Sequence, residues 1–232
     1  MESGEGFDRI GLSLMGKQVE LLKALYATGR PVVLVMVQGR PLELNWAAEH
    51  IPAILTTWYP GGEGGRAIAD VLFGDYNPAG RLPLSYPRHV GQLPVYYNHK
   101  SAERHDYVEG TAAPLYPFGF GLSYTTFVYE GIDVRVEGDS VRVSVDVKNV
   151  GGRAGDEVVQ LYLRDEQASV VTPFMQLKAF QRVHLTSGES RRVEFVLTEE
   201  HLRVLDTSLN WRVEPGWFTV MIGASSQDIR QR

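Results

Sequence analysis

A glutamate flanked by two glycines stands close to the start of the sequence, in the stretch SGEGFDR at residues 3–9. Glycine on both sides of Glu5 lets the backbone take unusual dihedral angles and bring the carboxyl close to a ligand. Asp8 and Arg9 follow at a spacing that lets them orient this carboxyl. Glu5 is therefore a candidate catalytic group, although the stretch by itself also fits a solvated loop near a terminus.

A second glycine-rich stretch, GGEGG at residues 61–65, is a candidate phosphate-binding turn because glycines before a helix can present N–H groups to an anion. No Lys-Ser or Lys-Thr pair follows it, so a tight strand-to-helix connection with Glu63 near the helix start explains it better. The rings of Trp58 and Tyr59 could stack on a sugar, but core or interdomain packing is the simpler interpretation.

The histidines show no metal-binding spacing, so solvated or capping roles suffice for them. We expect no metal and no cofactor. The absence of cysteine excludes disulfides, thiolate metal sites and cysteine nucleophiles. A net charge of -5 argues against nucleic acid or an anionic membrane as a partner, since both attract a concentrated basic face.

The first third of the chain alternates helical and strand patterns. Apolar spacing predicts a helix over 17–28, and the unbroken apolar run 32–37 predicts a strand of a parallel sheet that is covered on both faces. A second helix over 42–49, an apolar segment at 53–55 and a third helix after the glycine-rich turn complete a βαβ pattern. Prolines and glycines then predict an irregular stretch over 87–123, which we expect to wrap a surface or line a functional cleft.

Beyond residue 124 the apolar period becomes two. Alternation over 141–147 and 193–197, together with apolar runs separated by turn residues, predicts about seven short strands and an immunoglobulin-like sandwich. Trp211 and Trp217 are expected in its core or at its edge. The fold class is therefore α/β followed by all-β.

Four motifs follow the SGEGFDR stretch in a fixed order: QGRPL at 38–42, WYPGGEGG at 58–65, LFGDYNPAGRLP at 72–83 and YPFGFGLSY at 116–124. In this order and spacing they resemble glycoside hydrolase family 3, most closely its β-glucosidase type with a C-terminal fibronectin type III-like domain. The resemblance covers nearly the whole chain, since GDEVVQLY at 155–162 and QLKAF at 176–180 match the last domain. Met15 departs from it, because the family usually has proline ahead of Gly16.

The resemblance implies a three-part enzyme: a barrel with an aspartate nucleophile, an α/β sandwich domain with the acid/base glutamate, and a terminal β-sandwich. Glu5 matches the acid/base position, and Asp8 and Arg9 match its supporting pair at the substrate site. A retaining glycosidase needs two carboxyls about 5 Å apart, one to attack the anomeric carbon and one to protonate the departing oxygen. Only the second is present, so we expect the chain to begin inside a longer polypeptide.

The resemblance also sets the expected organisation. Residues 1–86 would be the C-terminal portion of the α/β sandwich, with a flavodoxin-like parallel sheet. Residues 87–123 would be an irregular linker and 124–232 the fibronectin type III-like domain. No leader pattern is present, so the compartment stays open, with a periplasmic or secreted parent enzyme among the options.

Three functions remain open from the sequence. The first is a fragment of a retaining, exo-acting β-glycosidase that acts on a β-glucoside or oligosaccharide and is inactive without its N-terminal barrel domain. The second is a noncatalytic module that binds carbohydrate or protein. The third is one subunit of a split enzyme whose barrel is encoded separately. Turnover by the isolated chain, binding by residues 124–232 and the sequence upstream of Met1 would separate them.

Overall fold

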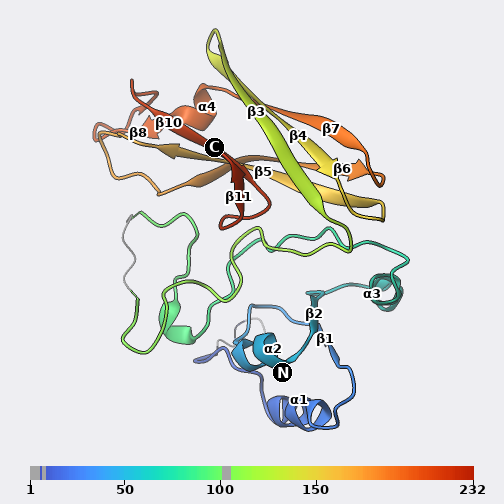
Figure 1. Cartoon of the computed structure of the whole chain (residues 1–232). Helices are drawn as coiled ribbons and strands as arrows, with labels where there is room; N and C mark the ends of the chain where they lie inside the picture. Colours follow the sequence, from blue (N-terminus) through green and yellow to red (C-terminus); the bar gives the residue numbers. More distant parts are fainter. Residues whose placement is uncertain (1–5, 7–8, 101–105) are drawn as a thin grey trace. The chain divides into compact units, whose positions relative to one another are not determined.

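Figure 1 presents the computed structural model of the chain, which describes Gly6, residues 9–100 and residues 106–232. It contains two compact units, one with helices beside a small parallel sheet and the other built from antiparallel strands. No helix in these described ranges is long and apolar enough to cross a membrane.

The two units do not follow one another along the chain. The first comprises the described residues up to Tyr76, with Ser85–Val95 and Tyr107–Tyr116. The second comprises Asn77–Leu84, the described part of 96–106, and Pro117–Arg232. The stretch expected to be a linker therefore contributes segments to both units. Its predicted bounds, residues 87 and 123, stay predictions.

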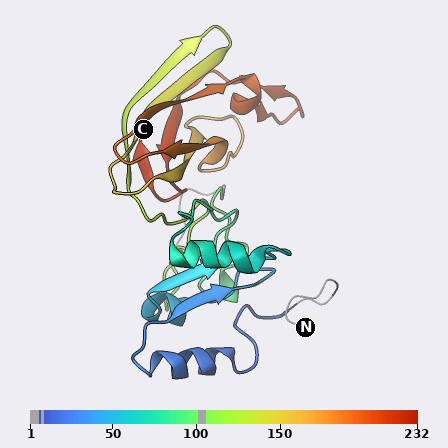
Figure 2. The ribbon, with the colours of Figure 1, turned by 90° about the vertical axis from the view of Figure 1, so that its right-hand side faces the viewer.

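The first unit contains two parallel strands with helices around them. Its elements are α1 (Gln18–Tyr26), β1 (Val33–Met36), α2 (Asn45–His50), β2 (Ala53–Thr56), α3 (Gly64–Phe73) and the 3-10 helix η1 (Val90–Gln92). The strands pair in register from Val33 opposite Ala53 to Met36 opposite Thr56. Figure 2 shows α1 and α3 on opposite faces of this pair. The predicted alternation of strands and helices is confirmed.

The prediction that the run 32–37 is covered on both faces is wrong for this chain. Val33 is 49% exposed, and Leu34 and Val35 are only partly buried. The sheet has only two strands among the described residues, so each strand keeps one unpaired edge and few neighbours to cover its side chains. Phe73, at the end of α3, is also exposed.

The second unit is a β-sandwich. Its elements are β3 (Phe127–Glu137), β4 (Ser140–Asn149), β5 (Gly155–Asp165), β6 (Gln176–Leu185), β7 (Ser190–Leu197), α4 (Glu199–Leu202), β8 (Val204–Leu205), β9 (Trp211–Arg212), β10 (Phe218–Gly223) and β11 (Ile229–Gln231). One sheet has the order β3-β4-β7 and the other β11-β10-β5-β6, while β8 and β9 form a separate short pair. The seven strands of the two sheets match the predicted sandwich (Figure 1).

The sandwich core consists of the inward residues of both sheets. Val143, Val145 and Val147 have no exposed surface, so the alternation over 141–147 is confirmed as a half-buried strand. Leu161 on β5 and Ile222 on β10 close the core from the opposite sheet. Burial of these aliphatic side chains supplies the main stabilisation of the unit.

The two tryptophans of the sandwich lie outside this core. Trp217 is 80% exposed, and Trp211 on β9 is also exposed, with the guanidinium of Arg203 over its ring at 4.9 Å. The part of the prediction that offered a core position for them is wrong. His201 does cap a helix, since it forms a capping box with Thr198 at the start of α4.

Irregular segments cover the outer face of the four-stranded sheet. The ring of Tyr97 stacks on Phe118 at 4.1 Å, and its hydroxyl accepts the N–H of Leu177 on β6 at 3.0 Å. Both rings pack against the fully buried Tyr162. Two residues of the YPFGFGLSY motif therefore have structural roles. Phe118 packs in this cluster, and Gly119 has a φ of +81°, where a residue with a side chain would be strained.

A buried ion pair fixes the segment that precedes this region. Arg81 and Glu157 lie 2.9 Å apart, with side chains 8% and 4% exposed. The same carboxylate oxygen accepts the N–H of Val158 at 3.0 Å. Both charges have left water, so the arrangement is stable only while each compensates the other.

Replacing Glu157 with alanine is expected to destabilise the sandwich by about 3–5 kcal/mol, because the Arg81 guanidinium would stay buried without an anion. Urea unfolding followed by circular dichroism measures the change. Glu137→Ala is the matched control, since its partner Arg142 is at the surface and the loss should be much smaller. Equal losses in the two variants would contradict the assignment.

Candidate functional site

The predicted acid/base residue lies outside the described part of the chain, as does Asp8. Arg9 is described, and its guanidinium donates to the carbonyl oxygen of Ser13 at 2.6 Å. Gly6 has a φ of +77°, the conformation that the glycine-flanked motif was expected to allow. The roles of Glu5, Asp8 and Arg9 therefore stay predictions.

The segment that follows Arg9 lies along the loop after β1. The N–H of Glu43 donates to the carbonyl oxygen of Leu12 at 2.9 Å, and both Leu12 and Leu44 are buried. In open parallel sheets the loops at the carboxyl ends of the strands form the ligand-binding edge. The hydrogen bond to Leu12 therefore holds the segment after Arg9 beside this edge.

A buried polar cluster stands at the same edge. Gln38, two residues beyond β1, is only 4% exposed, and Thr56 is the last residue of β2. The Gln38 amide donates to Thr56 Oγ1 at 3.1 Å and to the hydroxyl of Tyr86. Its amide oxygen is buried without a hydrogen-bond partner among the described residues, so a water or a ligand hydroxyl would satisfy it.

Tyr86 joins this cluster to the irregular segment 85–95. Its backbone exchanges two hydrogen bonds of 2.8 Å with the segment that contains Leu115 and Tyr116. Burial raises the pKa of Tyr86 above its ordinary value, against the opposing effect of its hydrogen bonds to Thr56 and Gln38. The phenol therefore remains protonated at neutral pH.

Trp58 has an unusual backbone conformation beside the cluster. Its φ is +52°, which is rare for a bulky side chain and costs about 1–3 kcal/mol. Its ring centroid lies 6.5 Å from that of Tyr86. Trp58 thus packs within the unit, as the simpler interpretation expected, whereas Tyr59 is exposed. Strained residues of this kind gather at functional sites.

The glycine-rich turn 61–65 behaves as a connection. Gly61 has a φ of +71°, Glu63 directly precedes α3, and a Cβ on Gly64 would collide with the ring of Pro60. The turn therefore requires glycine at position 61 for its backbone conformation and at position 64 for lack of space. Among the described residues, no group of three or more His, Asp or Glu side chains is placed to hold a metal ion.

Two family models match the chain, one over its first half and one within the β-sandwich. The description "Glycosyl hydrolase family 3 C-terminal domain" covers residues 1–124, and "Fibronectin type III-like domain" covers residues 157–226. The chain therefore belongs to glycosyl hydrolase family 3.

Curated relatives carry glycosidase names. The chain is 47% identical to the β-xylosidase of Formosa agariphila over 97% of its own length and 32% of that protein. It is 43% identical to the periplasmic β-glucosidase of Salmonella typhimurium over 98% of its length and 32% of that protein. The chain thus spans about a third of the length of these relatives.

Solved structures of β-glucosidases share the fold. One from Erythrobacter marinus matches with a TM-score of 0.93 and 46% identity, over 97% of this chain and 30% of that chain. One from Listeria innocua, in complex with isofagomine, matches with a TM-score of 0.89 and 40% identity, over 94% of this chain and 33% of that one. The predicted α/β plus β-sandwich architecture is confirmed.

Sequence reasoning missed the cluster of Gln38, Thr56 and Tyr86. Gln38 comes directly after the apolar run 32–37, which is the position where parallel sheets present ligand-binding residues. Gln38 could therefore have been recognised from the sequence. The contribution of Tyr86 could not, because it depends on a contact across 48 positions of sequence.

The raised pKa of Tyr86 predicts a loss of stability in alkali. The unfolded chain releases the phenol proton near pH 10, whereas the folded chain retains it to higher pH, so this contribution is present below about pH 10 and lost as pH rises above it. Tyr86→Phe should make the unfolding free energy less dependent on pH between about pH 9 and 11, as measured by urea titrations. Tyr59→Phe, which removes an exposed hydroxyl, should leave the slope unchanged; a common slope for both variants would contradict the prediction.

Proposed function

We propose that this chain supplies the proton-donating part of a retaining, exo-acting β-glycosidase, with Glu5 as the acid/base residue. The observation that carries the proposal is family membership combined with the SGEG stretch at residues 3–6. Glu5 would protonate the oxygen that leaves and then take a proton from the attacking water. Asp8 and Arg9 would orient its carboxyl.

The nucleophile would come from an N-terminal barrel domain. Each of the relatives has about two thirds of its length outside the region that this chain matches. The first unit is suited to contact further protein, because β1 and β2 each have an unpaired edge and Phe73 is exposed. Strand edges and exposed aromatic residues of this kind are normally covered by another part of the polypeptide. We therefore expect the chain alone to be inactive.

The substrate would be a β-linked pyranoside. Relatives are named both β-glucosidase and β-xylosidase, and the Listeria innocua enzyme is described in complex with glucose. We propose that the barrel decides between glucose and xylose. The buried edge around Gln38 and the strained Trp58 would shape the part of the site that this chain contributes.

A chimera tests the role of Glu5. This chain would replace the matching third of the Salmonella typhimurium β-glucosidase, and hydrolysis of aryl β-D-glucosides would be measured. Glu5→Gln should lower kcat/KM by about 10²–10⁴-fold for substrates with a poor leaving group, because this parameter reports the glycosylation step and only a poor leaving group needs protonation there. The kcat/KM of dinitrophenyl glucosides should fall much less, whereas their kcat should fall because hydrolysis of the glycosyl-enzyme intermediate loses its base. Added azide needs no base and should restore turnover with formation of a glycosyl azide.

Glu63→Gln is the matched control, since this glutamate is also flanked by two glycines and is exposed. It should leave kcat nearly unchanged. Equal effects of the two substitutions would rule out the acid/base role. So would a Glu5→Gln variant whose loss of kcat/KM is the same for good and poor leaving groups. Turnover by the 232-residue chain alone, abolished by Glu5→Gln, would rule out the need for a barrel.

A further inference from the structure

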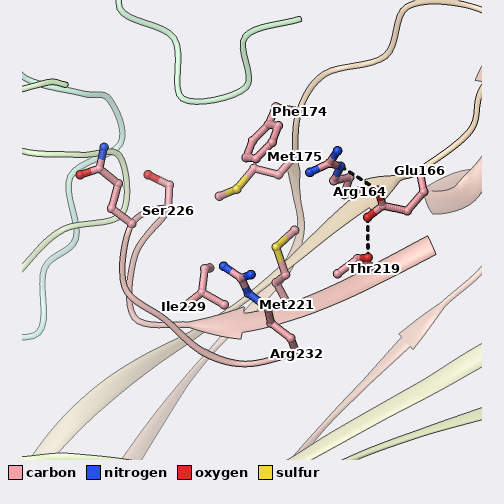
Figure 3. Close-up of a pocket in the computed structure, with 10 residues that line it drawn as sticks. Arg164, Glu166, Phe174, Met175, Thr219, Met221, Ser226, Ile229 and Arg232 are labelled. Carbon is pink, nitrogen blue, oxygen red and sulfur yellow. Dashed lines mark hydrogen bonds and ion pairs between the residues drawn. The ribbon is translucent and has the colours of Figure 1, made fainter. Parts of the chain in front are cut away.

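A pocket of about 370 Å³ opens on the outer face of the four-stranded sheet of the β-sandwich. This volume is at the lower end of the range of roughly 300–1,000 Å³ that small-molecule pockets occupy. Figure 3 shows its walls, which come from β5, the segment before β6, β10 and the turn into β11. The lining residues are Arg164, Glu166, Phe174, Met175, Thr219, Met221, Ser226, Gln227, Ile229 and Arg232.

The floor of the pocket is apolar. Met175 and Met221 are buried, and Ile229 packs against them. Methionine side chains adapt to the shape of a ligand, and an apolar floor of this kind can accept the C–H face of a sugar ring. A small inorganic anion would gain nothing from this surface.

One side of the rim is held rigidly. The Arg164 guanidinium lies over the ring of Phe174 at 4.6 Å and pairs with Glu166 at 3.1 Å. Thr219 donates its hydroxyl to the same carboxylate at 2.5 Å. The negative charge of Glu166 is therefore already compensated within the protein (Figure 3).

The other side of the rim has polar groups without partners. In the described part of the chain, no hydrogen bond or ion pair involves the Ser226 hydroxyl, the side-chain amide of Gln227 or the Arg232 guanidinium, whereas the backbone N–H of Gln227 donates to Ser225 Oγ at 3.3 Å. Of the three charged side chains that line the pocket, Arg164 and Glu166 pair with each other, which leaves the Arg232 guanidinium unpaired by another lining residue. The groups that can bind a ligand are thus one cation and two neutral hydrogen-bonding groups, which lie above an apolar floor.

We propose that this pocket binds an acidic sugar, a hexuronate, with its carboxylate at Arg232. Guanidinium and carboxylate form paired, charge-assisted hydrogen bonds, which a neutral sugar cannot make. The C–H face of the ring lies on Met175, Met221 and Ile229. The hydroxyls bond to Ser226 and Gln227. The pocket thereby gives the sandwich a binding role that does not depend on the proposed hydrolysis.

The methionines provide a direct test in the complete chain. The protein has five, of which Met175 and Met221 are in the pocket and Met15 and Met36 are in the first unit. With carbon-13 methyl labels, addition of methyl β-D-glucuronide should shift the Met175 and Met221 signals saturably and leave those of Met15 and Met36 in place. Methyl β-D-glucoside, which lacks the carboxylate, and acetate, which lacks the ring, should each bind at least about tenfold more weakly.

Arg232→Gln should weaken glucuronide binding by about tenfold, equivalent to about 1.4 kcal/mol. Arg135→Gln removes an exposed arginine on β3 and should have no effect. Because Arg232 is exposed, the variant is expected to fold. Absence of a shift at Met175 and Met221, equal affinity for glucoside and glucuronide, or an unchanged affinity in Arg232→Gln would each overturn the proposal.

Discussion

The ion pair between Arg81 and Glu157 holds the irregular segments of the second unit against its four-stranded sheet. Two charges buried at 2.9 Å from each other tolerate almost no displacement, because either one alone would be desolvated without compensation. The pair ties the segment 77–84 to the start of β5. The N–H of Leu82 in turn donates to Phe120 and its carbonyl accepts from Gly119, which brings the segment after residue 116 against the same sheet.

The pocket and the aromatic cluster depend on this arrangement. Phe118 contacts Tyr97, and the carbonyl oxygen of Phe118 accepts the N–H of Ser226 in the turn that forms one pocket wall. Phe174 is fixed by a backbone bond to His99 and by the stacked ring of that histidine. Segments without regular structure are thus specified by a few side chains and carbonyl groups, each with a defined partner.

Local pattern was sufficient to predict most of the fold. The apolar run 32–37 became β1 and the alternation over 141–147 became β4, since periodicity records which face of an element is buried. The pattern could not reveal that β1 would be half-exposed, because apolar character marks a side chain as suited to burial and does not say how many neighbouring elements cover it. Nor could it predict the Arg81 contact, whose partner lies 76 positions away.

The candidate site was predictable only in part. Glu5, Asp8 and Arg9 were recognised from a motif, and their roles stay predictions. Gln38 could have been identified from its position after a parallel strand, whereas the contribution of Tyr86 depends on how an irregular segment returns to the sheet. The pocket at Arg232 had no local signal, since its residues come from four separate parts of the sequence.

The interleaved course of the polypeptide limits how this protein can be divided. Residues 77–84 and 96–100 belong with the sandwich although they precede it, and 107–116 belongs with the first unit. A recombination event or an engineered cut at residue 124 would separate Glu157 from Arg81 and Tyr162 from Tyr97. The sandwich is therefore expected to be inherited together with its preceding segments, since residues 124–232 alone lack part of the contacts that stabilise it.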